Sequence, residues 1–230
     1  MYYLSIIIAV LCSVVVPIGL SVYVIKKDQI YLKTVLVGAL TFFISQVVIR
    51  IPLLGAIQTQ SVWAISLSIT SPLVFGLFLS LSAGVFEEVA RYIAMTYILK
   101  NRRGTKQAIA FGIGHGGIEA ILLVGINAIV MLFMYIPSVA PQMIIASGVE
   151  RLSAIAIHIT LSVIVMKGVV NRRKVFLISA ILLHTLFNFV AIYLSTIGSS
   201  VAIIELVLIC LGMIGLVFVK KQYSNEKETV

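Results

Sequence analysis

Ionisable side chains gather in one apolar stretch of this 230-residue chain, residues 86–119. Two acids are followed by an arginine, and then a histidine is followed by another acid: Glu87, Glu88, Arg91, His115 and Glu119. Such groups are costly inside a membrane, and where they occur they mark functional sites. We therefore expect them to form half of a buried hydrolytic site, with the rest supplied by His184 and Asn188.

The first acids can be read in two ways. Glu87 and Arg91 are four residues apart, on one face of a helix, so a structural ion pair between them is expected. Two adjacent acids against one arginine still leave one carboxylate without a counter-charge. A positioned carboxylate of that kind suits a general base or acid, so we assign catalysis to the pair Glu87 and Glu88.

The composition places these residues in a membrane. The chain is 61% hydrophobic and 11% charged, with a mean hydropathy of +1.16, which excludes an ordinary soluble domain. Apolar runs long enough to cross a bilayer recur from end to end. We predict an all-α, seven-helix membrane domain over residues 1–230, with runs near 2–25, 33–54, 72–99, 107–136, 143–166, 175–194 and 201–219.

The net charge of +9 reflects topology. Of the 17 lysines and arginines, only Arg50, Arg91 and Arg151 fall inside apolar runs, and the others lie in short turns or the tail. This placement excludes a nucleic-acid groove and follows the positive-inside rule. Basic and uncharged turns alternate, which predicts an N-terminus outside, a cytoplasmic C-terminus and a multi-pass membrane protein.

Other local features carry weaker expectations. Pro17 is expected to kink the first run. The uncharged connector 55–71 has room for an interfacial or re-entrant helix. Cys12 and Cys210 lie in apolar runs without metal-like spacing, so no disulfide is expected.

All three histidines share one depth. Each lies nine or ten residues from the basic turn on its own run: His115 from Lys106, His158 from Lys167 and His184 from Lys174. At about 1.5 Å per residue, each is roughly 14 Å from the cytoplasmic rim. Unrelated packing positions would not be expected to share a plane, so the histidines are predicted to meet.

Spacing pairs these histidines with other polar groups. His115 with Glu119, and His184 with Asn188, are i,i+4 pairs. Glu119 could be a ligand, an orienter of His115 or a partner of Arg91. The neighbour of His158 at this spacing is Ser162, which can satisfy itself on its own helix backbone.

Two further features are expected to serve structure. Glycines 112, 114, 116 and 117 around His115 could serve close helix packing or leave room for water or a peptide. Nearer the outer surface, we expect a structural ion pair between Arg50 and Glu150.

With these residues in place, the chain resembles the CAAX-protease and bacteriocin-processing (CPBP) superfamily of intramembrane proteases, and more closely its YhfC-type bacterial branch. The resemblance implies a multi-pass protein of a bacterial plasma membrane. The superfamily pattern is a Glu-Glu motif with a following arginine, then FxxxH, then HxxxN. Here these read EEVAR at 87–91, FGIGH at 111–115 and HTLFN at 184–188. The arginine comes one residue earlier than is usual. The YhfC resemblance also includes 46–52, the HGGIE run at 115–119, and Glu150-Arg151 with His158.

The resemblance implies hydrolysis of a peptide bond in a membrane protein or peptide substrate, within a cavity expected to open toward the cytoplasmic half. Glu87 or Glu88, with His115, would activate water, and His184 with Asn188 would stabilise the oxyanion. Arg91, Glu119 and His158 would support them.

A metal-dependent version competes with this one. It has Zn²⁺ held by His115, His158, His184 and Glu87. The His184–Asn188 pair favours the metal-free version, because it supplies an oxyanion donor where a third ligand would sit, whereas His158 argues for the metal.

Two other classes of function stay open. One is a transporter for a metal ion or a proton-coupled solute, and the other is a catalytically inactive scaffold.

Overall fold

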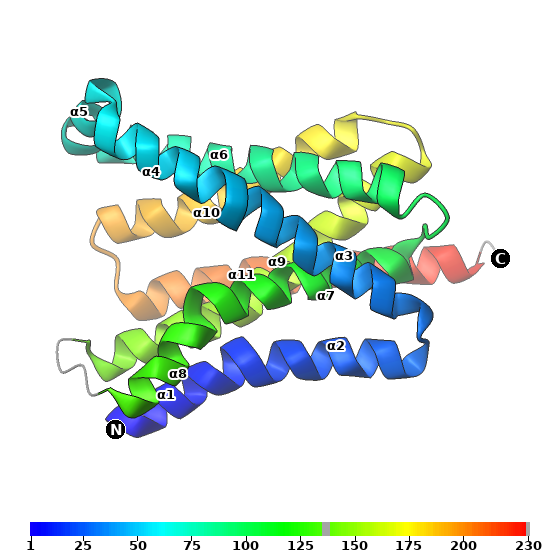
Figure 1. Cartoon of the computed structure of the whole chain (residues 1–230), viewed down its shortest axis with the longest axis horizontal. Coiled ribbons are helices and arrows are strands. Elements are labelled where there is room, and N and C mark those ends of the chain that lie inside the picture. Colours follow the sequence, from blue (N-terminus) through cyan, green and yellow to red (C-terminus); the bar gives the residue numbers. More distant parts are fainter. Residues whose placement is uncertain (135–138, 229–230) are drawn as a thin grey trace.

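The computed structural model describes residues 1–134 and 139–228, and in these ranges the chain is helical. Seven of its helices are long and apolar enough to cross a membrane, as expected (Figure 1). They are Tyr2–Lys27, Ile30–Gln60, Pro72–Ile98, Thr105–Phe133, Pro141–Val170, Val175–Thr196 and Val201–Glu226. The expected end of the fourth run, residue 136, lies outside the described residues.

Several spans are built from more than one helical segment. The first span consists of α1 (Tyr2–Val10), η1 (Leu11–Val15) and α2 (Val16–Lys27), and the second of α3 (Ile30–Phe42), η2 (Phe43–Arg50) and α4 (Ile51–Gln60). The third span consists of α6 (Pro72–Ile93) and η3 (Ala94–Ile98). The fourth consists of α7 (Thr105–Ala120), η4 (Ile121–Gly125) and α8 (Ile126–Phe133). The last three are α9 (Pro141–Val170), α10 (Val175–Thr196) and α11 (Val201–Glu228).

The η segments are π-helical, and two of them lead into prolines. Proline has no N–H to donate to the preceding turn, so the regular bonding pattern must change there. The segment η1 comes just before Pro17, where the sequence predicts a kink, and η2 comes just before Pro52.

The connector 55–71 contains the helix that the sequence left room for. The second span continues to Gln60, and a short helix, α5 (Val62–Thr70), follows it. The Oγ of Ser61 accepts a hydrogen bond from the N–H of Ala64 and caps α5. Trp63 lies edge-on to Phe78 of α6, with ring centroids 5.6 Å apart, so α5 packs back against the bundle.

Helix α9 is the inner helix of the bundle. In its apolar window 83% of the residues are buried, against 17–44% in the other six spans. It packs against α7, α11, α1 and α10. Residues on α9 are therefore enclosed on most sides, and those of the outer spans face lipid on one side.

Glycines of α7 allow this close packing. A Cβ on Gly112 would lie 2.5 Å from the Cα of Ile159 on α9, and one on Gly114 would collide with the backbone of Val35 on α3. A Cβ on Gly116 would lie 3.2 Å from the side chain of His158. Of the two readings left open by the sequence, close helix packing is thus the one observed at these three positions.

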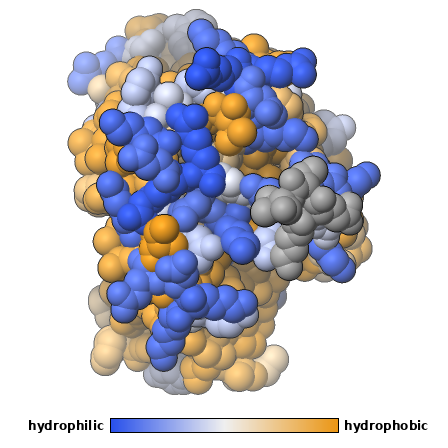
Figure 2. Space-filling view, turned by 90° about the vertical axis from the view of Figure 1, so that its right-hand side faces the viewer, coloured by the Kyte–Doolittle hydropathy of each residue, from blue (hydrophilic) through white to orange (hydrophobic). Residues whose placement is uncertain are grey.

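The basic turns lie at one end of the bundle. The turns after α2, η3 and α9, and the C-terminal end of α11, are together in Figure 1, while the N-terminus, α5 and the turn after α10 are at the opposite end. Viewed from the basic end, the molecule presents a largely hydrophilic face (Figure 2). We refer below to the basic end and the uncharged end.

The packing of Gly112 gives a testable expectation. Gly112→Ala should lower the free energy of unfolding by about 1–3 kcal/mol, because the new methyl group meets backbone atoms that cannot move aside. Gly55→Ala on α4, where nothing lies within 4 Å, should be neutral or slightly stabilising. Thermal unfolding in detergent measures both. Equal melting temperatures for Gly112→Ala and wild type would contradict the close approach of α7 and α9.

Candidate functional site

The three histidines meet in the bundle interior, as their shared depth predicts. His115 comes from α7, His158 from α9 and His184 from α10. Their rings follow one another, with centroids 4.8 Å apart for the first two and 5.4 Å apart for the last two. All three side chains are buried. Three separate helices therefore bring every imidazole of the protein to one place.

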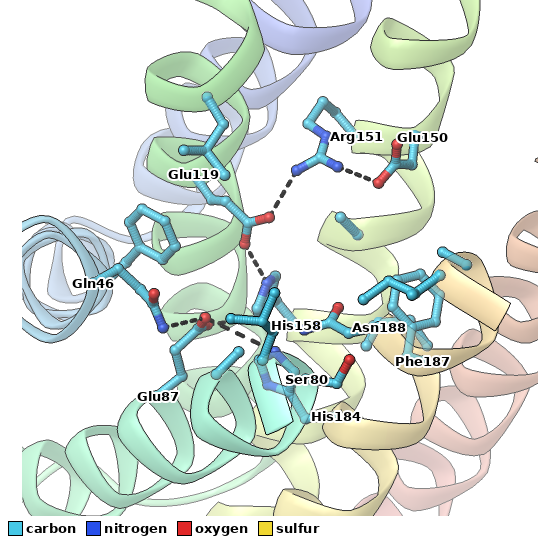
Figure 3. Close-up of a pocket in the computed structure, with 18 of the residues that line it drawn as sticks. Gln46, Ser80, Glu87, Glu119, Glu150, Arg151, His158, His184, Phe187 and Asn188 are labelled. Atoms are coloured by element: carbon cyan, nitrogen blue, oxygen red, sulfur yellow. Dashed lines mark hydrogen bonds and ion pairs between the residues drawn. The ribbon is translucent and has the colours of Figure 1, made fainter. Parts of the chain in front are cut away.

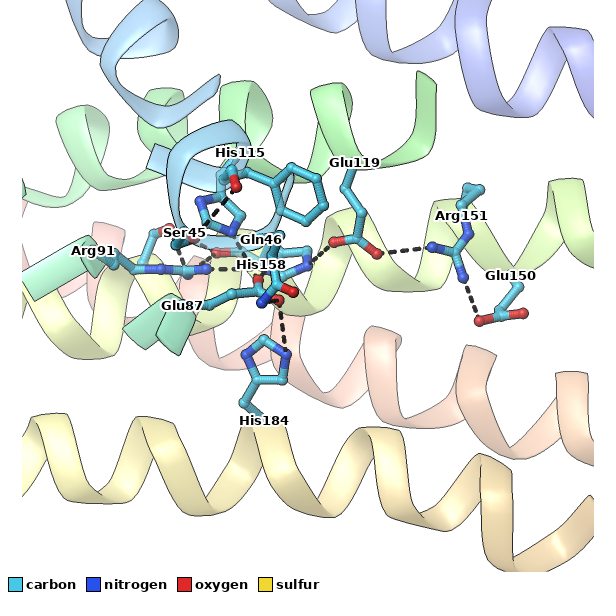
Figure 4. A network of polar contacts seen from close by, with 12 residues as sticks. Ser45, Gln46, Glu87, Arg91, His115, Glu119, Glu150, Arg151, His158 and His184 are labelled. Carbon is cyan, nitrogen blue, oxygen red and sulfur yellow. Dashed lines mark hydrogen bonds and ion pairs between the residues drawn. The ribbon is translucent and has the colours of Figure 1, made fainter. Parts of the chain in front are cut away.

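Glu87 of α6 lies in the middle of this group (Figure 4). Its Oε2 is 2.9 Å from Nε2 of His115 and 4.0 Å from Nδ1 of His158. Its Oε1 is 3.8 Å from Nε2 of His184. One carboxylate thus faces all three imidazoles, and no arginine among the described residues pairs with it.

Glu87 is held from its other side by Gln46 of η2. The Gln46 amide donates a hydrogen bond of 2.7 Å from Nε2 to Oε1 of Glu87. Its own Oε1 accepts a hydrogen bond of 2.9 Å from Arg50. Arginine can only donate, so this contact fixes which end of the amide faces Glu87. Arg50 is held in turn by Ser82 and by the carbonyl of Leu79 on α6.

The arginine of the first motif pairs with Glu88, and the expected Glu87–Arg91 pair is wrong. Nε of Arg91 is 3.3 Å from Oε2 of Glu88. Residues three and four apart both share a helix face, so spacing alone could not choose between the two acids. Oε1 of Glu88 lies 2.8 Å from Nδ1 of His184. Glu88 is therefore neutralised by Arg91 and orients His184, and Glu87 is the acid without a cationic side chain beside it.

Arg91 also joins α6 to α9. It donates to the carbonyl of His158 and to Oγ of Ser162, and its NH2 is 3.0 Å from Nδ1 of His158. Because arginine only donates, Nδ1 of His158 must accept. In the neutral ring Nε2 then carries the proton and donates to Glu119 at 2.5 Å. Ser162 also bonds the backbone carbonyl of His158, as expected.

Glu119 continues the network toward the uncharged end. It forms an ion pair of 2.8 Å with Arg151, which also pairs with Glu150. Of the roles expected for Glu119, partner of Arg91 and orienter of His115 are both wrong. The expected ion pair between Arg50 and Glu150 is also wrong, because each has other partners. Depth along a helix does not specify which neighbouring helix a side chain faces.

A cavity of about 360 Å³ adjoins the site (Figure 3). Glu87, Glu119, His158, His184 and Asn188 are among the residues that line it. The other two residues of the predicted constellation lie behind this wall. His115 contacts the cavity-lining Glu87, and Glu88 contacts the cavity-lining His184.

If the basic end is cytoplasmic, as the sequence predicts, the expected opening of the cavity toward the cytoplasmic half does not fit its walls. Leu79 and Ala83 precede Glu87 on α6, and α6 starts at the uncharged end. Ala191 and Ile192 follow His184 on α10, which runs toward that same end. The cavity therefore extends from the site toward the uncharged end.

The residues present fit a metal of the zinc class. Glu87, His115 and His158 each offer a ligand atom, and these atoms lie within 4.8 Å of one another. A carboxylate with two imidazoles is an established catalytic zinc set, and ligand atoms at about 2.0–2.1 Å from zinc would require this group to contract. His158 could bind the metal through Nδ1 only if NH2 of Arg91, now 3.0 Å from that nitrogen, moved away from it.

Two further observations support that fit. Metal-binding histidines commonly have their other ring nitrogen bonded to a carboxylate. His158 is held in this way by Glu119, and His184 by Glu88. The network also holds four carboxylates and three guanidinium groups, which leaves one negative charge if the histidines are neutral: Glu87, Glu88, Glu119 and Glu150 against Arg50, Arg91 and Arg151. A divalent cation would offset that charge.

The sequence reasoning did not assign Gln46, Arg50 and Arg151 to the site. The i,i+4 spacing of Gln46 and Arg50 was an available signal, because it puts an amide and a guanidinium on one helix face inside a membrane run. For Arg151 the available signal was a charge inside an apolar run and a place in the family resemblance, but only the tertiary structure brings Glu119 to it.

Fold and site together define a multi-pass membrane protein with a buried glutamate–histidine cluster. A sequence profile described as YhfC intramembrane metalloprotease matches residues 12–138 and 134–209. A relative from Bacillus subtilis (strain 168), named "Uncharacterized membrane protein YhfC", is 31% identical over 236 residues, covering 89% of this chain and 90% of its own length. The chain belongs to the YhfC family. No solved structure matches it significantly.

The Arg91–Glu88 pair leads to a stability prediction. Arg91→Ala should lower the free energy of unfolding by about 3–5 kcal/mol, because it leaves Glu88 charged and buried. The double variant Glu88→Gln/Arg91→Met should recover part of that loss, since neither residue then carries a charge. Arg103→Ala, at an exposed arginine of a basic turn, should change the free energy of unfolding by less than about 0.5 kcal/mol. Thermal unfolding of all three variants measures these changes. An Arg91→Ala protein as stable as wild type would contradict a buried ion pair between Arg91 and Glu88.

Proposed function

We propose that this protein is an intramembrane metalloprotease that hydrolyses a peptide bond of a membrane protein or peptide substrate. The observation that carries the proposal is the group of Glu87, His115 and His158, donated by three helices to one point of the bundle interior. The family description agrees with this chemistry. Because His158 joins the cluster, the metal-dependent version is favoured over the metal-free one.

The metal would be held by Glu87, His115 and His158, with Nε2 of His184 available as a further ligand. A zinc-class ion supplies a Lewis acid that activates water and polarises a carbonyl. The protein contributes a buried site on rigid helices, so the reacting groups are positioned before the substrate arrives. Gln46, Glu88 and Glu119 hold the carboxylate and the imidazoles in place.

The role of His184 follows from its hydrogen bond to Glu88. If its Nδ1 donates to that carboxylate, Nε2 of the neutral ring has a free electron pair and cannot donate to an oxyanion. His184 is then better suited to bind a metal or accept a proton. The amide of Asn188 in the cavity wall remains as the neutral donor for the developing oxyanion. Glu87 faces the cavity and is the acid that we assign to water activation or ligation.

We also infer membership of the CPBP superfamily and an orientation in the membrane. The three superfamily motifs lie on α6, α7 and α10, and their residues are in contact in this structure. The positive-inside rule applied to the basic end puts the C-terminus in the cytoplasm and the N-terminus outside.

The transporter and scaffold alternatives remain as outcomes of the tests. A transporter must offer a route to both faces of the membrane. Among the described residues, apolar side chains fill the region between the histidines and the basic end, so this conformation offers no route to that face.

The proposal predicts the loss of a cleavage event. Glu87→Gln should lower turnover by about 10²–10⁴-fold or more while the protein stays folded, because the carboxylate that binds the metal or activates the water is removed. Membranes from cells producing wild-type or variant protein can be compared by mass spectrometry of new peptide termini. The matched control is Glu205→Gln on α11, which should cleave like wild type. Cleavage by Glu87→Gln at the wild-type rate would exclude the assigned role. Absence of any cleavage by wild type would favour transport or a scaffold.

The contact between Gln46 and Glu87 makes a prediction about the metal itself. Gln46→Leu should weaken zinc affinity by about 10–100-fold, because groups that orient a ligand contribute on that scale. Gln107→Leu is a matched control: Gln107 is another buried glutamine, bonded to Thr34 nearer the basic end. Competition with a chromophoric chelator measures both affinities. Equal losses for the two variants would mean that general destabilisation, rather than the hold on Glu87, is responsible.

A further inference from the structure

The cavity approaches the site from one end only. Six spans contribute to its wall, and on each the lining residues lie level with the site or nearer the uncharged end. On α9, Glu150, Arg151 and Ala154 precede His158, and α9 starts at the uncharged end. On the second span, Arg50 and Ile51 continue from Gln46 toward that end.

The opposite half of the bundle is filled. A cluster of buried apolar side chains occupies it, and all but Ala120 and Ile155 lie between the site and the basic end. Phe111 precedes His115 by one turn, Met95 follows Arg91 by one turn, and both are fully buried. Water and a polar peptide would therefore have to disrupt a packed core to arrive from the basic side.

Charged groups follow the open route. The network runs from Glu87 through His158 to Glu119, Arg151 and Glu150 (Figure 4). Exposure of the carboxylates rises along it: the side chain is 6% exposed for Glu87, 12% for Glu119 and 35% for Glu150. Groups that stay ionised need water or partners, so this wall fits a hydrated path.

The cavity also borders the membrane. Two lining residues, Ile51 and Leu123, are 46% and 44% exposed within membrane spans, so the wall also reaches lipid-facing surface.

We propose that substrate reaches the site from the uncharged end, and that this substrate is a segment of a membrane protein at the external side of its membrane span. The identity of the occupant rests on the proposed hydrolytic function, whereas the route rests on the cavity and the packed core. With the C-terminus in the cytoplasm, segments on the cytoplasmic side of a target protein are excluded.

Cysteine accessibility tests the route without requiring hydrolysis. In a background with Cys12 and Cys210 replaced by alanine, single cysteines are introduced by Ala191→Cys, Ala180→Cys and Arg102→Cys. Ala180 and Ala191 are eleven residues apart on α10, about three turns, and so share a helix face. Ala191 lines the cavity, whereas Ala180 is in the packed core. A membrane-impermeant maleimide is added to intact cells or to inverted membrane vesicles.

The expected result is labelling of Ala191→Cys in intact cells only, of Arg102→Cys in inverted vesicles only, and of Ala180→Cys in neither. Leu79→Cys on α6 is a second position in the cavity wall, to be used if Ala191→Cys does not fold. Labelling of the cavity cysteine from the cytoplasmic side, which is the side expected to label Arg102→Cys, would overturn the route. Labelling of the cavity cysteine from neither side would overturn it as well. A protein that cleaves nothing can still pass this test, so failure of the route and failure of the hydrolytic function are separate results.

Discussion

The structure depends on compensating charge in a place without water. An ionised group in hydrocarbon must find an opposite charge or several hydrogen bonds. Arg91 is fully buried and meets that requirement through Glu88, the carbonyl of His158 and Ser162. Glu88, so neutralised, is free to orient His184. This one pair therefore fixes α6 against α9 and α10 and leaves Glu87 as the uncompensated acid. A site built this way is costly unless each member keeps its partner, so its polar groups must be placed by a well-packed scaffold.

The packing of small residues supplies that scaffold. Helix α7 approaches α9 and α3 at glycines, where any Cβ would meet backbone atoms. His115 and His158 can come within 4.8 Å of one another only because their helices are this close. The bundle is also divided along its length, with a packed apolar core toward the basic end and a cavity with charged residues in its wall toward the uncharged end. This division suits the proposed hydrolysis, in which water and substrate reach a buried site without a pore across the membrane.

Much of this arrangement could be predicted from the sequence, and the failures have a common cause. Hydropathy and basic turns predicted the seven spans, because both reflect the cost of moving a segment or a charge through the bilayer. Helical rise predicted that His115, His158 and His184 would meet. Depth says nothing about how a helix is rotated or which neighbour it faces. For that reason the partners of Arg91, Glu119 and Arg50 were predicted wrongly, and the contact between Gln46 and Glu87 was not foreseen. The direction of the cavity required the positions of its lining residues on all six spans.

The central claim is that Glu87, His115 and His158 form one metal site inside the membrane. The most direct measurement is the visible absorption spectrum of the purified protein reconstituted with Co²⁺, whose ligand-field bands report coordination number. We expect stoichiometric uptake and the intense bands of a four- or five-coordinate site, lost in His158→Ala and retained in Gln107→Leu. A folded wild-type protein that leaves Co²⁺ with the weak spectrum of the aqueous ion would contradict it.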